Sequence, residues 1–509
     1  MSYLLGVDAG LTNTKAAVFD STGSELTLAV RKTPNTDTGA DRAERDLEAF
    51  WETVAECISS VVADGPATAR EIEGVGVAGH GHGLYLLDAA GDPVRDGIES
   101  TDSRAAALNE EWTAAGTDDA IFDTVGYEPF VADPISLLAW LERNEPERYG
   151  RIDTVLFCKD YLKFRLTGEC CTDEMEASVF EAVETGEYAR RLFERLGMAE
   201  VTDALPSVVA AGEQMGTVTP AAAEATGLAA GTPVASGLHD VGAAALGSGV
   251  YGSGQAMFVV GTWGQSIVVG DDPAVDRAVG GIPRRYLDGY LSYKGNRSAA
   301  TCLDWFAGEF GDSWRAEAEA RGVSEYQVYD EAVAETPVGA EGVVFHPYLH
   351  GTTDNPRSRG GFYGLAESHT RRHMLRAIYE GVAITQCERL RELASDVGSL
   401  DVRIAGGSAK SEVWTQIFAD VLGEPIRVPG GDEPGARGAA VCAAVATGVY
   451  QSPRRAVEEM VEIRRTHRPD PGNVDRYRDV RDAFETARAA LTDTWEQLNR
   501  IRAREHHDE

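Results

Sequence analysis

Two segments in opposite halves of the chain place glycine and hydroxyl side chains in a turn between apolar strands. The first contains Gly10, Thr12, Asn13 and Lys15, and the second contains Gly261 and Thr262. A turn of this kind exposes backbone N–H groups, which bind phosphate oxygens. Two such turns indicate a duplicated fold that holds a polyphosphate in the cleft between its halves. Two ordinary hairpins would give the same pattern, because glycine-rich turns are common.

Asp8 follows the mostly apolar segment 3–7 and precedes the first turn, so we expect it at the carboxyl end of a strand. A carboxylate beside bound phosphates can hold Mg²⁺, usually through water. The ammonium of Lys15 would supply positive charge for the same phosphates. The alternatives are a turn-forming aspartate and an ordinary surface lysine.

A third candidate is the strand-like segment 402–405, which leads through Gly406 and Gly407 to a helix that starts at Ser411. A strand, a glycine pair and a helix start suit a nucleotide. The G-x-G-x-x-G fingerprint of dinucleotide sites is absent. Small residues at 433–440 open another helix and would let an adenine lie against the backbone. Close helix packing would use the same residues.

Asp240 ends the segment 237–240, directly after the strand-like residues 233–236. Phosphoryl transfer to a hydroxyl needs a carboxylate that accepts the hydroxyl proton as the oxygen attacks. The place of Asp240 at the mouth of the expected cleft makes it a candidate. Spacing alone does not separate it from the many other aspartates of the chain.

The loop 79–83 carries His80, Gly81 and His82 between further glycines. Two histidines at this spacing can bind a metal ion, but no other ligand types cluster near them in the sequence. We therefore favour a polar loop that contacts a hydroxylated substrate. Asp102 and Arg104 are candidates for the same pocket, and an ion pair at the surface is the alternative.

The elements that must position these residues follow a repeated order. Apolar alternation predicts a hairpin and a strand within residues 1–35 and a buried strand at 72–78, and an apolar face predicts a helix at 46–62. Residues 103–200 are expected to be largely helical. The second half repeats the order, from a hairpin to helices at 371–393 and 411–422.

This order predicts two mixed α/β domains. We place an N-terminal domain at 1–247, a C-terminal domain at 248–449, and a helical extension at 450–509 that packs on the core. A chain of 509 residues is long enough for two large cores.

Composition restricts the partners. The formal net charge of −35 argues against nucleic acid and anionic membranes. Because the acidic residues are spread along a chain with few lysines, we interpret the charge as adaptation to high salt rather than as ordinary acidity. The seven cysteines show no metal-binding spacing and indicate reduced thiols. With no apparent signal peptide or membrane span, a soluble cytoplasmic protein is expected.

Further motifs resemble those of the FGGY carbohydrate kinases, within the actin/hexokinase-like ATPase superfamily. The likeness covers about residues 3 to 450. It is strongest at Gly360-Gly361-Phe362-Tyr363-Gly364-Leu365, together with residues 373 and 377–380. Residues Lys159-Asp160-Tyr161-Leu162 also resemble the family, as do residues 406–411 and 414–420. The family implies two actin/hexokinase-like (ribonuclease H-like) ATPase domains that flank a central cleft.

The resemblance also assigns roles. By position, Asp240 matches the catalytic base and Asp8 the acidic residue near Mg²⁺. The first phosphate loop of the family matches Gly10, Thr12 and Lys15, and the second matches Gly261 and Thr262. The family's adenosine-binding segment matches Gly406, Gly407 and Ser411. Gly81 and His82 fall where xylulose kinases contact the sugar. ATP and Mg²⁺ are implied, and a homodimer is a family-level expectation.

Some positions depart from the family pattern. Leu11 replaces a threonine in the first loop, and Leu137 stands where the N-terminal signature has lysine. The sequence His80-Gly81-His82 differs from the loops of D-xylulose and glycerol kinases, and the chain is most similar to the L-xylulose kinase branch. The predicted reaction is phosphorylation of a terminal hydroxyl of a ketopentose or related sugar or polyol, with ribulose and erythritol also open. The alternative is an actin-fold ATP-binding regulator or assembly protein without sugar chemistry.

Overall fold

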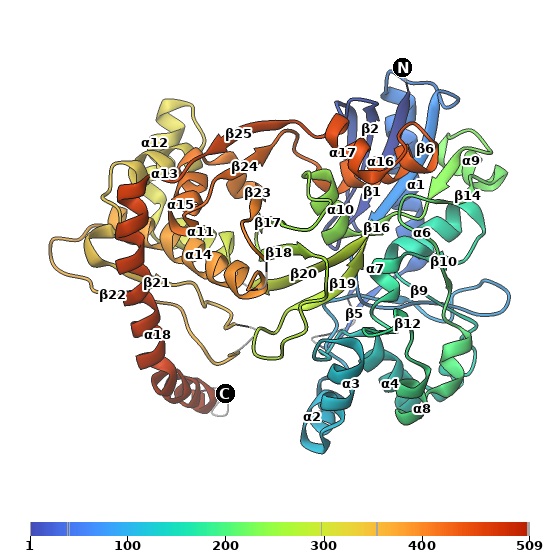
Figure 1. Cartoon of the computed structure of the whole chain (residues 1–509), viewed down its shortest axis with the longest axis horizontal. Helices are drawn as coiled ribbons and strands as arrows, with labels where there is room; N and C mark the ends of the chain where they lie inside the picture. The colour runs from blue at the N-terminus through green and yellow to red at the C-terminus, as the bar shows by residue number, and fades with distance from the viewer. Residues whose placement is uncertain are drawn as a thin grey trace. The chain divides into compact units, whose positions relative to one another are not determined.

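The computed structural model describes residues 2–37, 39, 41–296, 298–352, 355–395 and 397–505 (Figure 1). It divides into two compact units, each assembled from separate parts of the sequence. Unit 1 comprises Met1–Ser253, Val269–Ser292 and Gly431–Glu462, and unit 2 comprises Gly254–Val268, Tyr293–Gly430 and Ile463–Glu509. The predicted domain limits at 247/248 and 449/450 stay a prediction, and residues 506–509 of the predicted extension lie outside the described ranges.

Unit 1 is built on a seven-stranded sheet with the order β14-β15-β6-β1-β2-β3, to which β16 is added beside β6. Strand β1 pairs antiparallel with β2 and parallel with β6. The strands are β1 (Tyr3–Ala9), β2 (Asn13–Asp20), β3 (Glu25–Lys32), β6 (Ile72–Gly79), β14 (Gln214–Thr217), β15 (Pro233–Ala235) and β16 (Leu238–His239).

The second seven-stranded sheet has the order β19-β20-β18-β17-β23-β24-β25. Strand β17 pairs antiparallel with β18 and parallel with β23, just as β1 pairs with β2 and β6. The strands are β17 (Gln255–Val260), β18 (Gly264–Gly270), β19 (Ile282–Tyr286), β20 (Gly289–Asn296), β23 (Asp401–Ala405), β24 (Ile426–Pro429) and β25 (Ile463–His467). The repeated order confirms the predicted duplication of a mixed α/β unit.

Further strands of the described residues form short ladders outside the two large sheets. They pair β4 (Thr36–Asp37) with β5 (Ala43–Arg45) and β8 (Gly97–Ile98), β7 (Tyr85–Leu87) with β9 (Thr154–Leu156), β10 (Cys171–Thr172) with β13 (Ser207–Val208), β11 (Glu181–Ala182) with β12 (Glu187–Tyr188), and β21 (Val344–His346) with β22 (Gly361–Tyr363).

The predicted helix at 46–62 is confirmed as α1 (Leu47–Asp64). Its first turn is fixed by Asp46, whose side chain accepts a hydrogen bond from the backbone N–H of Ala49. Its apolar residues, among them Phe50 and Trp51, are buried in the core of unit 1. The sequence signals are a capping aspartate and an apolar stripe at helical spacing, and both act locally.

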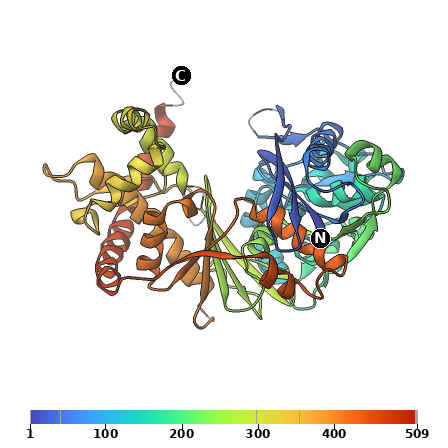
Figure 2. The same cartoon turned by 90° about the horizontal axis from the view of Figure 1, so that it is seen from above.

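The other helices of unit 1 include a late one that returns to the first strands. They are α2 (Ala106–Ala115), α3 (Thr117–Val125), α4 (Pro134–Asn144), α5 (Pro146–Tyr149), α6 (Cys158–Thr167), α7 (Glu174–Ala177), α8 (Arg190–Arg195), α9 (Pro220–Thr226), α10 (Asp240–Gly247), α16 (Pro434–Ala446) and α17 (Pro453–Met460). Figure 2 shows orange α16 beside the blue strands near the N-terminus. A Cβ on Gly6 would lie 1.8 Å from the carbonyl oxygen of Ala436, so glycine in β1 permits this close approach.

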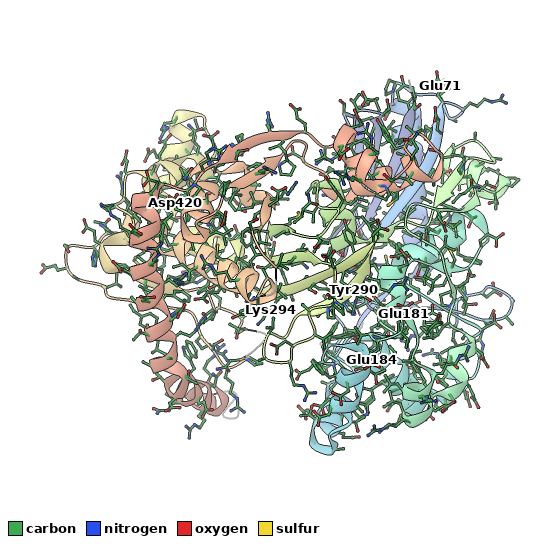
Figure 3. The ribbon with its side chains drawn as sticks, in the orientation of Figure 1. Glu71, Glu181, Glu184, Tyr290, Lys294 and Asp420 are labelled. Atoms are coloured by element: carbon green, nitrogen blue, oxygen red, sulfur yellow. The ribbon has the colours of Figure 1, made fainter. Side chains whose placement is uncertain are left out.

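Unit 2 carries α11 (Ala300–Phe310), α12 (Asp312–Arg321), α13 (Glu325–Ala334), α14 (Arg371–Leu393), α15 (Glu412–Leu422) and α18 (Pro471–Glu505). The prediction of a wholly helical segment after residue 450 is wrong at β25, which pairs antiparallel with β24. Asp420 of α15, labelled in Figure 3, accepts hydrogen bonds from the backbone N–H of Asp470 and the amide of Asn473. These bonds attach the start of α18 to α15. No helix within the described ranges is both long and apolar enough to cross a membrane.

Candidate active site

The first glycine turn joins β1 to β2. The backbone N–H of Gly10 donates to the carbonyl of Asn13 at 3.1 Å, and the hydroxyl of Thr33 donates to the carbonyl of Gly10 at 3.0 Å. The side chains of Thr12 and Asn13 are exposed on this closed turn. Two of the predicted phosphate ligands are therefore available at the surface of unit 1.

Asp8 and Lys15 lie directly opposite each other on β1 and β2. The Lys15 ammonium is 2.5 Å from a carboxylate oxygen of Glu433, which precedes α16. A Cβ on Gly435 would lie 2.2 Å from Oδ2 of Asp8, so the first turn of α16 approaches that carboxylate closely. Lys15 is therefore already paired with an acidic side chain in this structure.

The surroundings of Asp8 suit a hydrated cation. Burial raises the pKa of Asp8 to about 6, the charge of Lys15 opposes that rise, and Glu433 adds to it. Within the described ranges, no three His, Cys, Asp or Glu side chains converge as a metal cage. A single carboxylate fits Mg²⁺, because this ion keeps several waters and takes further ligands from substrate phosphates.

Asp240 is the first residue of α10. Its Oδ1 accepts the backbone N–H of Val241 at 2.7 Å and lies 3.2 Å from Nε2 of His239. Burial, together with the negative charge of Asp8, raises the pKa of Asp240 to about 7. A carboxylate with this pKa is poised to accept a proton near neutral pH.

Three neighbouring parallel strands, β1, β6 and β16, bring Asp8, the histidine loop and Asp240 to one edge of the sheet. Asp8 is in register with Ala78 of β6, and His239 of β16 is in register with Gly79 at the end of β6. Gly237 reaches this position with a φ of 74°, and a Cβ there would lie 2.1 Å from the carbonyl oxygen of Val77. The carboxyl ends of β1, β6 and β16 therefore carry Asp8, the histidine loop and Asp240, as is typical of ligand sites in α/β sheets.

The two loop histidines have different surroundings. His80 is 2 % exposed, and its Nε2 forms a 2.9 Å hydrogen bond with the hydroxyl of Tyr85. The Nε2 of His80 is therefore occupied by a protein partner, and its predicted contact with the substrate stays a prediction. His82 has a φ of 59° and packs edge-on against Phe130, with ring centroids 4.7 Å apart. Burial, and then the charge of Arg284, hold its pKa well below the usual range, so its imidazole is neutral.

Asp102 and Arg104 are buried and bind each other. Nη2 of Arg104 lies 2.8 Å from Oδ2 of Asp102, Nε donates to Oδ1 at 2.8 Å, and Nη2 also bonds Glu44 at 2.6 Å. The predicted alternative was an ion pair at the surface, whereas this pair is inside unit 1. Nε and Nη2 of Arg104 are directed to carboxylates of the protein, whereas its buried Nη1 has no hydrogen-bond partner among the described residues, and a role in holding sugar stays a prediction.

The second glycine turn, in unit 2, is also closed by a backbone hydrogen bond from its glycine, but to the carbonyl two residues later rather than three. The backbone N–H of Gly261 donates to the carbonyl of Trp263 at 3.1 Å, and the hydroxyl of Thr301 donates to the carbonyl of Thr262 at 2.7 Å. The side chain of Thr262 is exposed, as is that of Thr12 in the first turn.

The glycine pair after β23 also keeps its predicted form. Gly406 has a φ of 92° and packs on the backbone of Val260, whereas a Cβ on Gly407 would meet nothing within 4 Å. Ser411 caps α15 by accepting the backbone N–H of Trp414, and its hydroxyl donates to Asp330 at 2.7 Å. Gly407 therefore offers open backbone, while the side chain of Ser411 already has partners.

Comparison with known proteins decides the family. Residues 3–247 match the model of the N-terminal domain of the FGGY family of carbohydrate kinases, and residues 256–447 match that of the C-terminal domain. The chain belongs to the FGGY family of carbohydrate kinases. The predicted sugar kinase is thus confirmed at the level of the family and of the enzyme class.

Relatives of this FGGY kinase include sugar and polyol kinases. It is 34% identical to the L-xylulose/3-keto-L-gulonate kinase of Escherichia coli over 92% of this chain and 93% of that protein. It is 29% identical to the erythritol kinase of Brucella abortus over 97% of both chains. The crystal structure of the xylulose kinase from Rhodospirillum rubrum superimposes with a TM-score of 0.85 and 27% identity, covering 97% of this chain and 100% of that one. These matches confirm the predicted fold class.

The structure adds residues to the site of the FGGY kinase that sequence reasoning missed. Arg284 of β19 stacks on Tyr127 at 4.3 Å, and the Tyr127 hydroxyl donates to Asp133 at 2.7 Å. The charge of Arg284 acts on both His82 and His239. His239 stands next to Asp240 in the sequence, and this adjacency was the signal that could have marked it as a site residue. Nothing local in the sequence marks Arg284.

Proposed function

We propose that this FGGY kinase transfers the γ-phosphoryl group of ATP to a terminal hydroxyl of a ketopentose, with L-xylulose as the first candidate. The observation that carries the proposal is Asp240, a carboxylate with a pKa near 7 at the sheet edge that also holds Asp8 and the His82 loop. The printed activity of the 34% identical relative supports the sugar, and includes a keto-sugar acid as a second candidate.

The chain's own residues supply the proton chemistry and the positioning. Asp240 accepts the proton of the attacking hydroxyl, and the neutral imidazole of His82 bonds a neighbouring oxygen of the sugar. In unit 1 the hydroxyl of Thr12 is our candidate for binding phosphate, and in unit 2 the candidates are the hydroxyl of Thr262 for phosphate and the open backbone at Gly407 for the nucleoside. Mg²⁺, when held near Asp8, neutralises phosphate charge.

The first test is a panel of ketoses, keto-sugar acids and polyols with ATP and Mg²⁺. We expect sugar-dependent release of ADP with the highest kcat/KM for a ketopentose, because the relatives act on xylulose-type sugars. The assay should contain molar KCl, since the net charge of −35 predicts adaptation to high salt. ATP binding without sugar-dependent turnover across the whole panel would favour the regulator or assembly protein.

We also propose that this kinase is a cytoplasmic protein and forms a homodimer.

The second test is the pH dependence of kcat/KM. Because the pKa of Asp240 is raised to about 7, its carboxyl is protonated at lower pH and becomes the base only as pH rises. We expect kcat/KM to fall about tenfold per pH unit below that value and to level off above it. Asp8→Asn removes a negative charge that raises this pKa, so its rising limb should move to lower pH. A limb near pH 4, as for an ordinary aspartate, would contradict the assignment.

A further inference from the structure

The imidazole of His239 lies in the space that a side chain at position 81 would occupy. A Cβ built on Gly81 would be 1.8 Å from Nε2 and 1.9 Å from Cδ2 of His239. The three nearest atoms to this Cβ all belong to that ring, and the φ of Gly81 lies outside the left-handed region. Glycine at this position is therefore explained by the ring and not by backbone conformation.

The same ring contacts the carboxylate of Asp240. Nε2 of His239 is 3.2 Å from Oδ1 of Asp240, which also accepts the backbone N–H of Val241. In the tautomer that carries its proton on Nε2, the ring has a donor 3.2 Å from Oδ1. If this donor and the backbone N–H of Val241 both hold Oδ1, Oδ2 is the oxygen that remains to take the proton of the sugar hydroxyl.

The surroundings favour a neutral imidazole that is held in place. His239 is 5 % exposed, and its ring meets that of His82 edge-on with centroids 6.2 Å apart. Burial lowers the pKa of His239 well below its usual range, and the charges of Arg284, Lys159 and a protonated His80 act in the same direction. A neutral ring has one N–H to donate, so its orientation decides whether Asp240 receives that bond.

We propose that His239 is a positioning residue for Asp240, and that Gly81 is glycine because it makes room for the His239 ring. The proposal rests on the proposed role of Asp240 as the base. It assigns Gly81 a function that differs from direct contact with the sugar. The loop at Gly81 and the segment that carries Asp240 then act together through one imidazole.

A pair of matched variants separates hydrogen bonding from space filling. His239→Gln keeps an amide N–H that can reach Oδ1, whereas His239→Leu fills the space without a donor. We expect His239→Leu to lower kcat about 10–100-fold, the effect of losing a hydrogen bond to a charged group, with little change in the KM of the sugar. His239→Gln should retain most of the wild-type kcat. Thermal melting checks that each variant is folded.

A double-mutant cycle tests the role of Gly81. Gly81→Ala should lower kcat much as His239→Leu does, because the new Cβ displaces the ring. In a His239→Ala background the space is empty, so Gly81→Ala should have no further effect. Gly308→Ala is the control, since a Cβ at Gly308 of α11 would meet nothing within 4 Å.

Each other outcome overturns the proposal in a recognisable way. Equal loss in His239→Gln and His239→Leu would make the ring a packing element, and a rise in sugar KM at unchanged kcat would make it a sugar ligand. Additive losses at positions 81 and 239 would remove the link between them. Asp240→Asn is measured beside these variants. If it is inactive while His239→Leu is normal, only the positioning role fails, and if it is fully active, the proposed base itself is wrong.

Discussion

Asp240→Asn is expected to lower kcat by a factor of about 10²–10⁴, which is the usual contribution of a positioned general base. The asparagine amide keeps the size of the side chain and can still accept the backbone N–H of Val241 at Oδ1. It cannot take the proton of the sugar hydroxyl. Because the negative charge near Asp8 is removed at the same time, we expect no loss of stability at neutral pH.

The measurement is steady-state release of ADP with saturating sugar and ATP, together with nucleotide binding. We expect nucleotide affinity close to wild type, because the predicted adenosine segment at Gly406, Gly407 and Ser411 belongs to unit 2, whereas Asp240 belongs to unit 1. Asp20→Asn is a suitable control, since Asp20 ends β2 and its side chain accepts hydrogen bonds from the neighbouring Thr22 and Ser24. A folded Asp240→Asn variant with wild-type turnover would exclude Asp240 as the base.

The sequence predicted the parts of this kinase that depend on local patterns. The hairpins around Gly10 and Gly261 and strand β6 follow from apolar alternation and glycine turns, and helix α1 follows from its apolar face. The family motifs then placed Asp240 and Asp8 in one site, and the electrostatic effect of Asp8 on Asp240 agrees with that placement.

Long-range packing was not predictable in the same way. The small residues of α16 were interpreted as a nucleotide surface or as close helix packing, and the structure supports packing, because a Cβ on Gly438 would lie 1.9 Å from the carbonyl oxygen of Ala243. Lys15 shows no local sign of its partner Glu433, which lies more than four hundred positions away. Such pairs depend on the returning chain segment Gly431–Glu462 and not on any nearby spacing.

Lys159→Met is expected to destabilise unit 1 strongly. The Lys159 ammonium is fully buried, 2.5 Å from Oδ1 of Asp160 and 2.6 Å from Oδ2 of Asp173. Removing one partner of a buried ion pair leaves an uncompensated charge and costs about 3–5 kcal/mol. Lys163 still lies 2.9 Å from Asp160, so the carboxylate left without a close cation is that of Asp173. Urea unfolding of the wild type and the variant measures the loss as a lower midpoint.

Two further variants distinguish a buried charge effect from a general loss of packing. Adding Asp173→Asn to Lys159→Met removes the uncompensated carboxylate and should recover part of the stability. Arg143→Met breaks an ion pair with Glu111 in which both side chains are more than half exposed, so it should change the midpoint little. A Lys159→Met variant as stable as the wild type would show that methionine packing compensates for the lost pair. The ion pair between Lys159 and Asp173 would then not be required for the stability of unit 1, which also carries Asp240.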